Sequence, residues 1–345
     1  MLTRCDPAID VSVILVNWNG REDLDLCINS LLNQNVAAEL ILVDNASTDG
    51  SRSFVRRAFP EQVRIIELDA NVGYGAGLNA GIDACSGRFI FALNTDTEVA
   101  PSCLATLIDR ADRYPNVGSF APKILSFQEP SVLDNVGHLL YPDGLSRGRG
   151  RLEHDQGQYD NEEEILIASG CAMLLRRSML ADVGVFDPDL FAYCEDTDLA
   201  LRAQLKGWRC RAVPTAVVYH KYSASTAPYS PEKAFLVERN RVWVSTKCLP
   251  APLLAVSPAF TLLRLAAQAF GAITHRGAAG KFAATRSRAE LVSILARAWG
   301  AAIRGLPSAL RKRRLVQSVR RIAMHETLPW VRRYRMGLAE VALKD

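Results

Sequence analysis

Polar side chains that could hold a ligand follow a short apolar run in this chain. The run Phe89–Leu93 is too short for a buried helix and is typical of an interior strand, and Asn94, Thr95 and Asp96 follow it directly. In an open α/β sheet, ligands bind outside the carboxyl ends of the strands. A carboxylate placed there is a natural ligand for Mg²⁺ or Mn²⁺, cations that also hold substrate phosphates. Asp96 is therefore a candidate metal ligand.

Three earlier apolar runs also end in polar residues. Strands are expected at 11–16, 40–43 and 63–66, and helical segments separate them. This alternation predicts an α/β fold with a mainly parallel central sheet and flanking helices. The polar strand ends should meet in one crevice, where a nucleotide is expected. The candidate donor-binding residues are Asn17, Asp44, Asn71, Gly73, Asn79, Asn94, Thr95 and Asp96.

Two of these candidates have a competing interpretation. Asp44 could accept a hydrogen bond from the imide N–H of a pyrimidine base, or it could simply form an Asx turn that caps a helix. Gly73 belongs to a glycine-rich stretch that lets backbone approach a ligand. That stretch also satisfies the dinucleotide pattern G-x-G-x-x-A over 75–80. An NAD-dependent oxidoreductase is thus an alternative, although the pattern follows the third strand and not the first.

A second acidic group lies near residue 196. Glu195, Asp196 and Asp198 begin a helix expected over 196–206. Acids at a helix start are common because they favour the helix dipole, but three exceed what capping needs. One of them could deprotonate an acceptor hydroxyl as a general base. A strand expected over 213–219 then delivers His220, which with Asp96 would complete a cation site of oxygen and nitrogen ligands.

Charge is distributed unevenly along the chain. Residues 1–249 hold 24 Lys and Arg against 33 Asp and Glu, whereas residues 250–345 hold 17 against 4. We therefore expect an acidic, nucleotide-binding domain over 1–249 and a basic, helical extension over 250–345. A basic extension suggests a polyanionic partner. With no nucleic-acid recognition module in the sequence, an anionic membrane surface is favoured over nucleic acid.

Residues 253–273 are apolar enough to suggest a membrane span. Pro258, Arg264 and Gln268 interrupt the apolar run, and a charge at the centre of a bilayer is costly. The sequence thus favours a helix that lies in the membrane interface. The eight cysteines contain no C-x-x-C pair, so reduced thiols are expected and not a zinc site or disulfide framework.

Taken in order, several segments resemble the inverting family-2 glycosyltransferases of the A-type fold, most closely their rhamnosyltransferase-like branch. The resemblance implies that Asp44 recognises the base, that Asp96 and His220 bind the metal, and that Asp196 is the catalytic base beside Glu195. Asn94 departs from the family, because it replaces the first acid of the D-x-D motif. The matching segments are 11–20, 43–51, 71–75, 93–98, 195–198 and His220.

The resemblance also implies an activity. The enzyme would transfer one sugar, L-rhamnose from dTDP-L-rhamnose, to a lipid-linked saccharide in cell-envelope polysaccharide synthesis, at the cytoplasmic face of the inner membrane. Single addition is expected because Val242 replaces the arginine of the polymerase motif Q/R-x-x-R-W. The alternatives are transfer from another UDP- or dTDP-sugar, the oxidoreductase, and a non-catalytic membrane scaffold.

Overall fold

A computed structural model describes residues 6, 9–221, 230–284 and 286–343. Its contacts divide the chain into two compact units. The first comprises Met1–His138, Gly148–Ala203 and Trp208–Ser225, and the second comprises Leu139–Arg147, Gln204–Gly207 and Thr226–Asp345. The expected boundary at residue 249 therefore lies within the second unit, because the helix Pro231–Cys248 belongs there.

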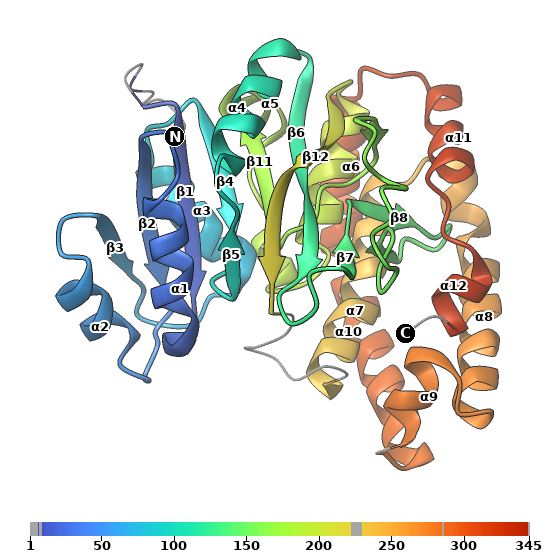
Figure 1. The fold of residues 1–345 in the computed structure, drawn as a ribbon. Helices are drawn as coiled ribbons and strands as arrows, with labels where there is room; N and C mark the ends of the chain where they lie inside the picture. Colours follow the sequence, from blue (N-terminus) through green and yellow to red (C-terminus); the bar gives the residue numbers. More distant parts are fainter. Residues whose placement is uncertain (1–5, 7–8, 222–229, 285, 344–345) are drawn as a thin grey trace. The chain divides into compact units, whose positions relative to one another are not determined.

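Among the described residues of the first unit, ten strands form one sheet (Figure 1). Its main path runs in the order β10-β12-β6-β11-β4-β1-β2-β3, while β5 pairs with β12 and β7 pairs with β6. The strands are β1 (Val11–Asn17), β2 (Ala38–Asp44), β3 (Val63–Glu67), β4 (Phe89–Leu93), β5 (Thr97–Val99), β6 (Val117–Ser126), β7 (Leu133–Asn135), β10 (Glu164–Ile165), β11 (Ala172–Arg176) and β12 (Arg209–His220).

The direction of the strands decides where the site forms. Strands β1 to β4 are mutually parallel where they pair, and β12 is parallel to β6. Strand β11 is antiparallel to both β4 and β6. The carboxyl ends of β1, β2, β4 and β12 and the beginning of β11 consequently share one edge of the sheet. The mainly parallel sheet predicted from the sequence is confirmed.

Helices cover both faces of this sheet. Side chains of α1 (Arg21–Leu32), α2 (Ser51–Ala58) and α4 (Cys103–Arg113) join the core on one face. Those of α3 (Tyr74–Ala84) and α5 (Arg177–Val183), with Leu199 and Ala203 of α6 (Glu195–Leu205), join the core on the other. The central strands β1 and β4 are buried along their whole length, as expected for strands covered on both faces.

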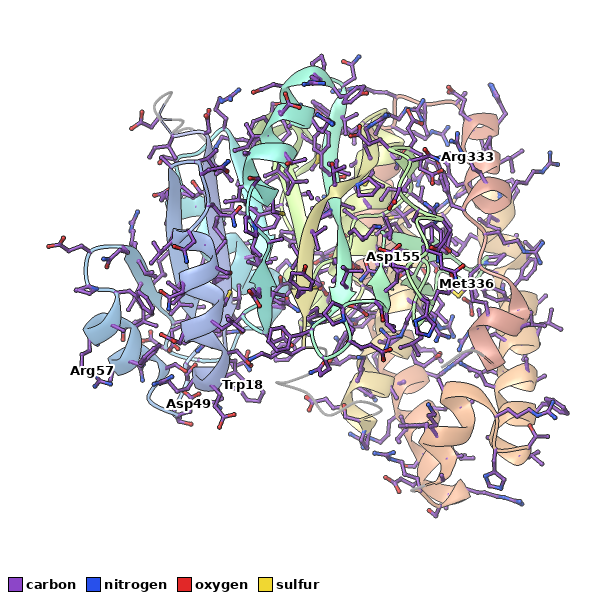
Figure 2. All side chains as sticks on the ribbon, viewed as in Figure 1. Trp18, Asp49, Arg57, Asp155, Arg333 and Met336 are labelled. Atoms are coloured by element: carbon purple, nitrogen blue, oxygen red, sulfur yellow. The ribbon has the colours of Figure 1, made fainter. Side chains whose placement is uncertain are left out.

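The second unit is mainly helical in its described part, and it also holds most of a two-stranded sheet of β8 (His138–Leu140) and β9 (Ser146–Gly148). Its helices are α7 (Pro231–Cys248), α8 (Ala251–Ile273), α9 (Gly277–Ala284), α10 (Arg288–Ser318), α11 (Met324–Arg333) and α12 (Leu338–Leu343). Trp243 of α7 donates a hydrogen bond from Nε1 to the Ala302 carbonyl of α10 (2.9 Å). Gly305 permits this approach, because a Cβ there would lie 2.3 Å from the Trp243 ring. In Figure 2, Arg333 extends outward from α11, whereas Met336 is completely buried.

Four buried charged residues tie α8 to the rest of the second unit. Arg264 of α8 lies 2.7 Å from Asp143 Oδ2 and 2.7 Å from Glu238 Oε1. Arg241 of α7 pairs with Glu238 (2.8 Å). Arg264 therefore points into the protein. Arg264 interrupts the apolar run in the sequence, but its charge is not on the outer surface of the helix. Pro258 lies within a continuous helix.

The ion pair of Asp198, the third acid of the group Glu195, Asp196 and Asp198, gives a first prediction. The Asp198 carboxylate is completely buried and lies 2.8 Å from Arg202 Nε, while the guanidinium also donates to the carbonyls of Val183 and Val185 (3.0 and 2.8 Å). Asp198→Ala would leave a buried charge unpaired. We expect it to lower the free energy of unfolding by about 3–5 kcal/mol, measured by urea denaturation. Loss no greater than for the exposed-site control Glu61→Ala would contradict this role.

Candidate active site

His220 lies between two buried carboxylates. It ends β12, and its Nε2 is 3.4 Å from Oδ1 of Asp96, in the loop after β4. Its Nδ1 is 2.8 Å from Oδ2 of Asp134 on β7. The other Asp134 oxygen lies 2.8 Å from Arg151. The two metal-ligand candidates, far apart in the sequence, are therefore brought together, and Asp134 holds the histidine ring from behind.

These contacts set the charges of the cluster. Burial alone would lower the pKa of His220, but the Cys171 sulfur and the hydrogen bonds to Asp134 and Asp96 raise it well above its ordinary value. Burial would likewise raise the pKa of Asp134, but the hydrogen bond and charge of His220, with Arg151, hold it below its ordinary value. His220 and Asp134 therefore each favour the charged form of the other.

The donor set fits a hard divalent cation. Asp96 offers a carboxylate oxygen, and His220 directs its Nε2 toward the same point. The Asp134 contact to Nδ1 is the usual outer hydrogen bond of a metal-binding histidine. No group of three His, Cys, Asp or Glu side chains suited to a metal occurs within the described residues. The protein would thus provide two ligands, and substrate phosphates and water would provide the others.

Asp44 is held by its neighbours at the end of β2. Its Oδ2 accepts a hydrogen bond from the backbone N–H of Ser47 (3.0 Å), and Oδ1 lies 3.4 Å from Asn17 Nδ2. Arg52 lies 3.4 Å from Oδ2. The carboxylate is completely buried. Asp44 therefore stabilises the turn after β2 but caps no helix, because α2 begins at Ser51 with Gly50 as its N-cap. Recognition of a base by Asp44 stays a prediction. Figure 2 shows Trp18 and Asp49 in the loops that follow β1 and β2.

The residues before α3 form a second polar network. Asn71 Oδ1 accepts from Asn45 Nδ2 (2.9 Å) and from the Gly73 backbone (3.0 Å). Gly73 has a positive φ of 88°, and a Cβ there would lie 2.2 Å from the Phe191 carbonyl oxygen. Only glycine fits such a position. The close approach expected of Gly73 is thus made by protein backbone from the loop that precedes α6.

The remaining donor-binding candidates, Asn79, Asn94 and Thr95, differ in their contacts with the protein. Both polar atoms of Asn79 bond to the backbone of Phe186, at 2.9 and 3.0 Å. The Asn94 backbone N–H donates to the Cys171 carbonyl (2.8 Å), which ties the loop after β4 to the start of β11. The side chains of Asn94 and Thr95 are half-buried at the edge of the sheet. Donor binding by Asn79, Asn94 and Thr95 remains a prediction.

The second acidic group follows a strained loop. Phe191, Tyr193 and Cys194 all have positive φ, between 64° and 68°, a conformation that non-glycine residues adopt rarely and at a cost of about 1–3 kcal/mol each. Strain of this kind persists only when the surroundings enforce it. Here the Phe191 carbonyl accepts a hydrogen bond from the Tyr74 N–H (2.7 Å) at the start of α3. The loop delivers Glu195 and Asp196 to the first turn of α6.

Asp196 is oriented by backbone and by a histidine. Its Oδ2 accepts from the Gly170 N–H (2.9 Å) and lies 3.5 Å from Nδ1 of His138, the first residue of β8 (His138–Leu140). Its Oδ1 accepts from the N–H of Thr197 (2.6 Å). Gly170 lies close to both acids, since a Cβ there would be 3.3 Å from Glu195 Oε1 and 3.4 Å from Asp196 Oδ2. Asp196 therefore has a fixed position at the shared edge.

Glu195 has a strongly altered protonation equilibrium. Burial, followed by the negative charge of Asp196, raises the pKa of Glu195 to about 8. Its Oε2 is buried and has no hydrogen-bond partner among the described residues. At neutral pH the side chain is mainly a neutral carboxyl group, which can donate a hydrogen bond. A carboxyl group with a raised pKa beside a second acid is typical of catalytic sites.

Tyr74 shows that the two acidic groups are close to one another. Its hydroxyl donates to the Gly170 carbonyl (2.8 Å). Burial and the neighbouring negative charges of Glu195, Asp196 and Asp96 raise its pKa well above the ordinary value. Asp96, Glu195 and Asp196 therefore all act electrostatically on one buried phenol.

Two residues of this site were missed from the sequence. Asp134 and His138 come from short strands in a region without clear periodicity. Their only sequence signal is the stretch Asp134–His138 itself, in which an acid, an amide, a glycine and a histidine interrupt an apolar region.

The fold and this edge of polar residues define a glycosyltransferase of the A-type fold, and comparisons with known proteins agree. The model of the family "Glycosyl transferase family 2" matches residues 12–184. The chain belongs to that family.

Individual relatives support the same fold. An N-acetylglucosaminyl-diphospho-decaprenol L-rhamnosyltransferase of Mycobacterium tuberculosis is 28% identical over 262 residues, which cover 67% of this chain and 85% of the relative. A mannosyltransferase of Pyrobaculum calidifontis, solved with GDP-Man and Mn²⁺, has a TM-score of 0.53 at 19% identity and covers 96% of this chain and 88% of its own. GalNAc-T7, solved with UDP, GalNAc and Mn²⁺, has a TM-score of 0.57 at 16% identity over 70% of this chain and 48% of its own.

The raised pKa of Glu195 gives a second prediction. Between its ordinary value of 4.5 and about 8, the folded state binds more protons than the unfolded state, so stability must fall as pH rises through this window. Glu195→Gln stays neutral at all pH values and should remove that loss. We expect the difference in melting temperature between variant and parent to increase from pH 5 to pH 9 (about the window just given). An unchanged difference across the window would contradict the assignment.

Proposed function

We propose that this enzyme transfers a single sugar, L-rhamnose from dTDP-L-rhamnose, to a lipid-linked saccharide during cell-envelope polysaccharide synthesis. The observation that carries the proposal is the gathering of Asp96, His220 and Asp196 at one edge of the sheet. The choice of sugar and acceptor is supported by the relative named as a decaprenol-linked L-rhamnosyltransferase. Another UDP- or dTDP-sugar as donor is the alternative within the same fold.

Donor binding would use both sides of the edge. Asp44 and Asn17 would face the nucleoside, while Asp96 and His220 would hold Mg²⁺ or Mn²⁺ beside the diphosphate. Structures of two fold relatives contain Mn²⁺. A bound cation would neutralise the negative charge that develops on the leaving nucleoside diphosphate. Asp134 keeps the His220 ring in the orientation that this binding requires.

Asp196 would act as the catalytic base. As the acceptor oxygen attacks the anomeric carbon, the carboxylate removes its proton, and the bond from that carbon to the diphosphate breaks on the opposite side. One displacement inverts the configuration of the anomeric carbon. Gly170 and His138 fix the carboxylate during this step, and the neutral Glu195 can donate a hydrogen bond to a sugar oxygen.

The second unit would bring the enzyme to its acceptor. Its residues 250–345 are strongly basic, with 17 Lys and Arg against 4 Asp and Glu. Such a region favours attachment to anionic lipids, and the cytoplasmic face of the inner membrane would provide both these lipids and the nucleotide-sugar donor. A lipid-linked acceptor lies in the same membrane.

A panel of nucleotide sugars tests the proposal directly. The protein is incubated with Mn²⁺ and each candidate donor, and binding is measured by calorimetry. We expect dTDP-L-rhamnose to bind more tightly than UDP- or GDP-sugars. Preference for another donor would overturn the choice of sugar, and failure to bind any of them would overturn the transferase proposal and favour a membrane scaffold.

Asp196→Asn gives the third prediction. The amide keeps the size and most contacts of the carboxylate but cannot accept the proton, so transfer should fall by about 100- to 10,000-fold. Donor affinity should change little, because Asp196 acts on the acceptor. Glu61→Gln is the control, because Glu61 is exposed and is distant in the sequence from the residues of the site. Substantial transfer by Asp196→Asn would show that another group is the base.

Asp134→Asn gives the fourth prediction. Without the carboxylate behind it, His220 loses the charge that holds its ring, and loss of such an outer partner typically weakens metal binding by about 10- to 100-fold. The measurement is Mn²⁺ affinity by electron paramagnetic resonance, with the same Glu61→Gln control. An affinity equal to that of the parent would mean that Asp134 has no such positioning role.

A further inference from the structure

Helix α8 has its polar side chains inside and its apolar side chains outside. Ser257, Thr261 and Arg264 are buried, and each has a partner within the second unit. The exposed positions of the helix are all apolar or proline: Ala251, Pro252, Ala255, Val256, Pro258, Ala259, Leu262, Leu263, Ala266, Ala269, Phe270 and Ile273. A helix on the surface of a water-soluble domain shows the reverse arrangement.

The inward polar face is fully occupied. Arg264 pairs with Asp143 and Glu238 and also donates to Gln268 (2.9 Å). Thr261 Oγ1 lies 3.2 Å from Asp143 Oδ2, and Ser257 donates to the Leu254 carbonyl. None of these groups therefore has to leave the protein when the opposite face enters an apolar medium.

The outward face is large and continuous along the helix. Leu262 and Ile273 are 68% and 70% exposed, so most of each side chain faces away from the protein. The helix is also the single described helix whose length and composition would let it cross a membrane. In Figure 1, α8 lies in the part of its unit that also contains α9 and α12, which both contact it.

The charges beside α8 indicate what covers this face. Between residues 250 and 289 the sequence has five Lys and Arg (Arg264, Arg276, Lys281, Arg286 and Arg288) and no Asp or Glu. Arg276, Lys281 and Arg288 are exposed. An apolar helical face followed by exposed basic residues matches lipid hydrocarbon bordered by anionic headgroups.

We propose that α8 inserts its outward face, which includes Leu262, Leu263, Phe270 and Ile273, into the hydrocarbon boundary of a lipid bilayer, while the Asp143–Glu238–Arg241–Arg264 cluster holds its polar face in the protein. The proposal rests on the membrane partner of the proposed function and adds the inserting surface. It differs from attachment by charge alone in one respect. Salt screens the charges of the headgroups but not the contact with hydrocarbon, so membrane binding should persist at high salt.

Vesicle binding tests the insertion. The full-length protein is sedimented with vesicles of phosphatidylcholine plus phosphatidylglycerol, at low and at high salt, and we expect binding under both conditions. Leu262→Asp and Phe270→Asp should each lower the partition coefficient at least roughly tenfold, because a carboxylate is strongly disfavoured in hydrocarbon. Leu32→Asp, at an exposed apolar site on α1, is the matched control and should bind as the parent does.

Depth and oligomeric state provide independent readouts. Tryptophan at position 262 (Leu262→Trp) should be quenched by lipids brominated on their acyl chains, whereas Leu32→Trp should not. Complete release by high salt, or no quenching of Leu262→Trp, would overturn insertion. A dimer in solution that becomes monomeric in Leu262→Asp would also overturn it, by showing that a second copy covers the face.

The outcome is separable from that of the proposed function. Donor binding in solution does not require a membrane, so it should be equal in Leu262→Asp, Phe270→Asp and the parent. Vesicle binding without sugar-nucleotide binding would refute the transferase proposal alone. Sugar-nucleotide binding without vesicle insertion would refute the role of α8 alone.

Discussion

The burial of several carboxyl groups at one edge of the sheet is the constraint on which the site depends. An ionised carboxylate that leaves water without compensation costs several kcal/mol. The acids here meet that requirement in three ways. Asp96 and Asp134 share the charge of His220, Asp196 accepts backbone hydrogen bonds, and Glu195 is largely protonated at neutral pH. The compensation fixes each side chain in place and gives it a distinct chemical character.

The same requirement explains why the loops around the edge are so tightly built. The carboxylates can be compensated only if β11, α3 and α6 approach closely at their ends. Gly73 lacks the side chain that would prevent this approach at the start of α3, and three residues of the loop before α6 have positive φ. Backbone strain is thus concentrated next to the acids. It is balanced by hydrogen bonds such as that from Tyr74 to Phe191.

Much of the fold and part of the site could be predicted from the sequence. Strand β4 and its polar end were predicted because a buried parallel strand has a continuous apolar run, and parallel strands place their ends together. Asp134 and His138 were missed because short strands have no detectable periodicity, and their partners are distant in the sequence. The direction in which Arg264 points could not be predicted for a related reason. A sequence gives the composition of a helix, but the face that is buried depends on acids elsewhere in the chain, here Asp143 and Glu238.

One electrostatic rule therefore accounts for both units. In the first unit, buried charges are paired at the edge of a sheet, which leaves carboxylate and imidazole groups oriented toward a shared point. In the second, the pairing of Arg264 with two acids removes the only ionised group of α8 from its outer surface. The Arg264 charge is paired within the protein. The exposed side of the helix can therefore be entirely apolar. A polar interior and an apolar exterior are thus consequences of the same ion pairs.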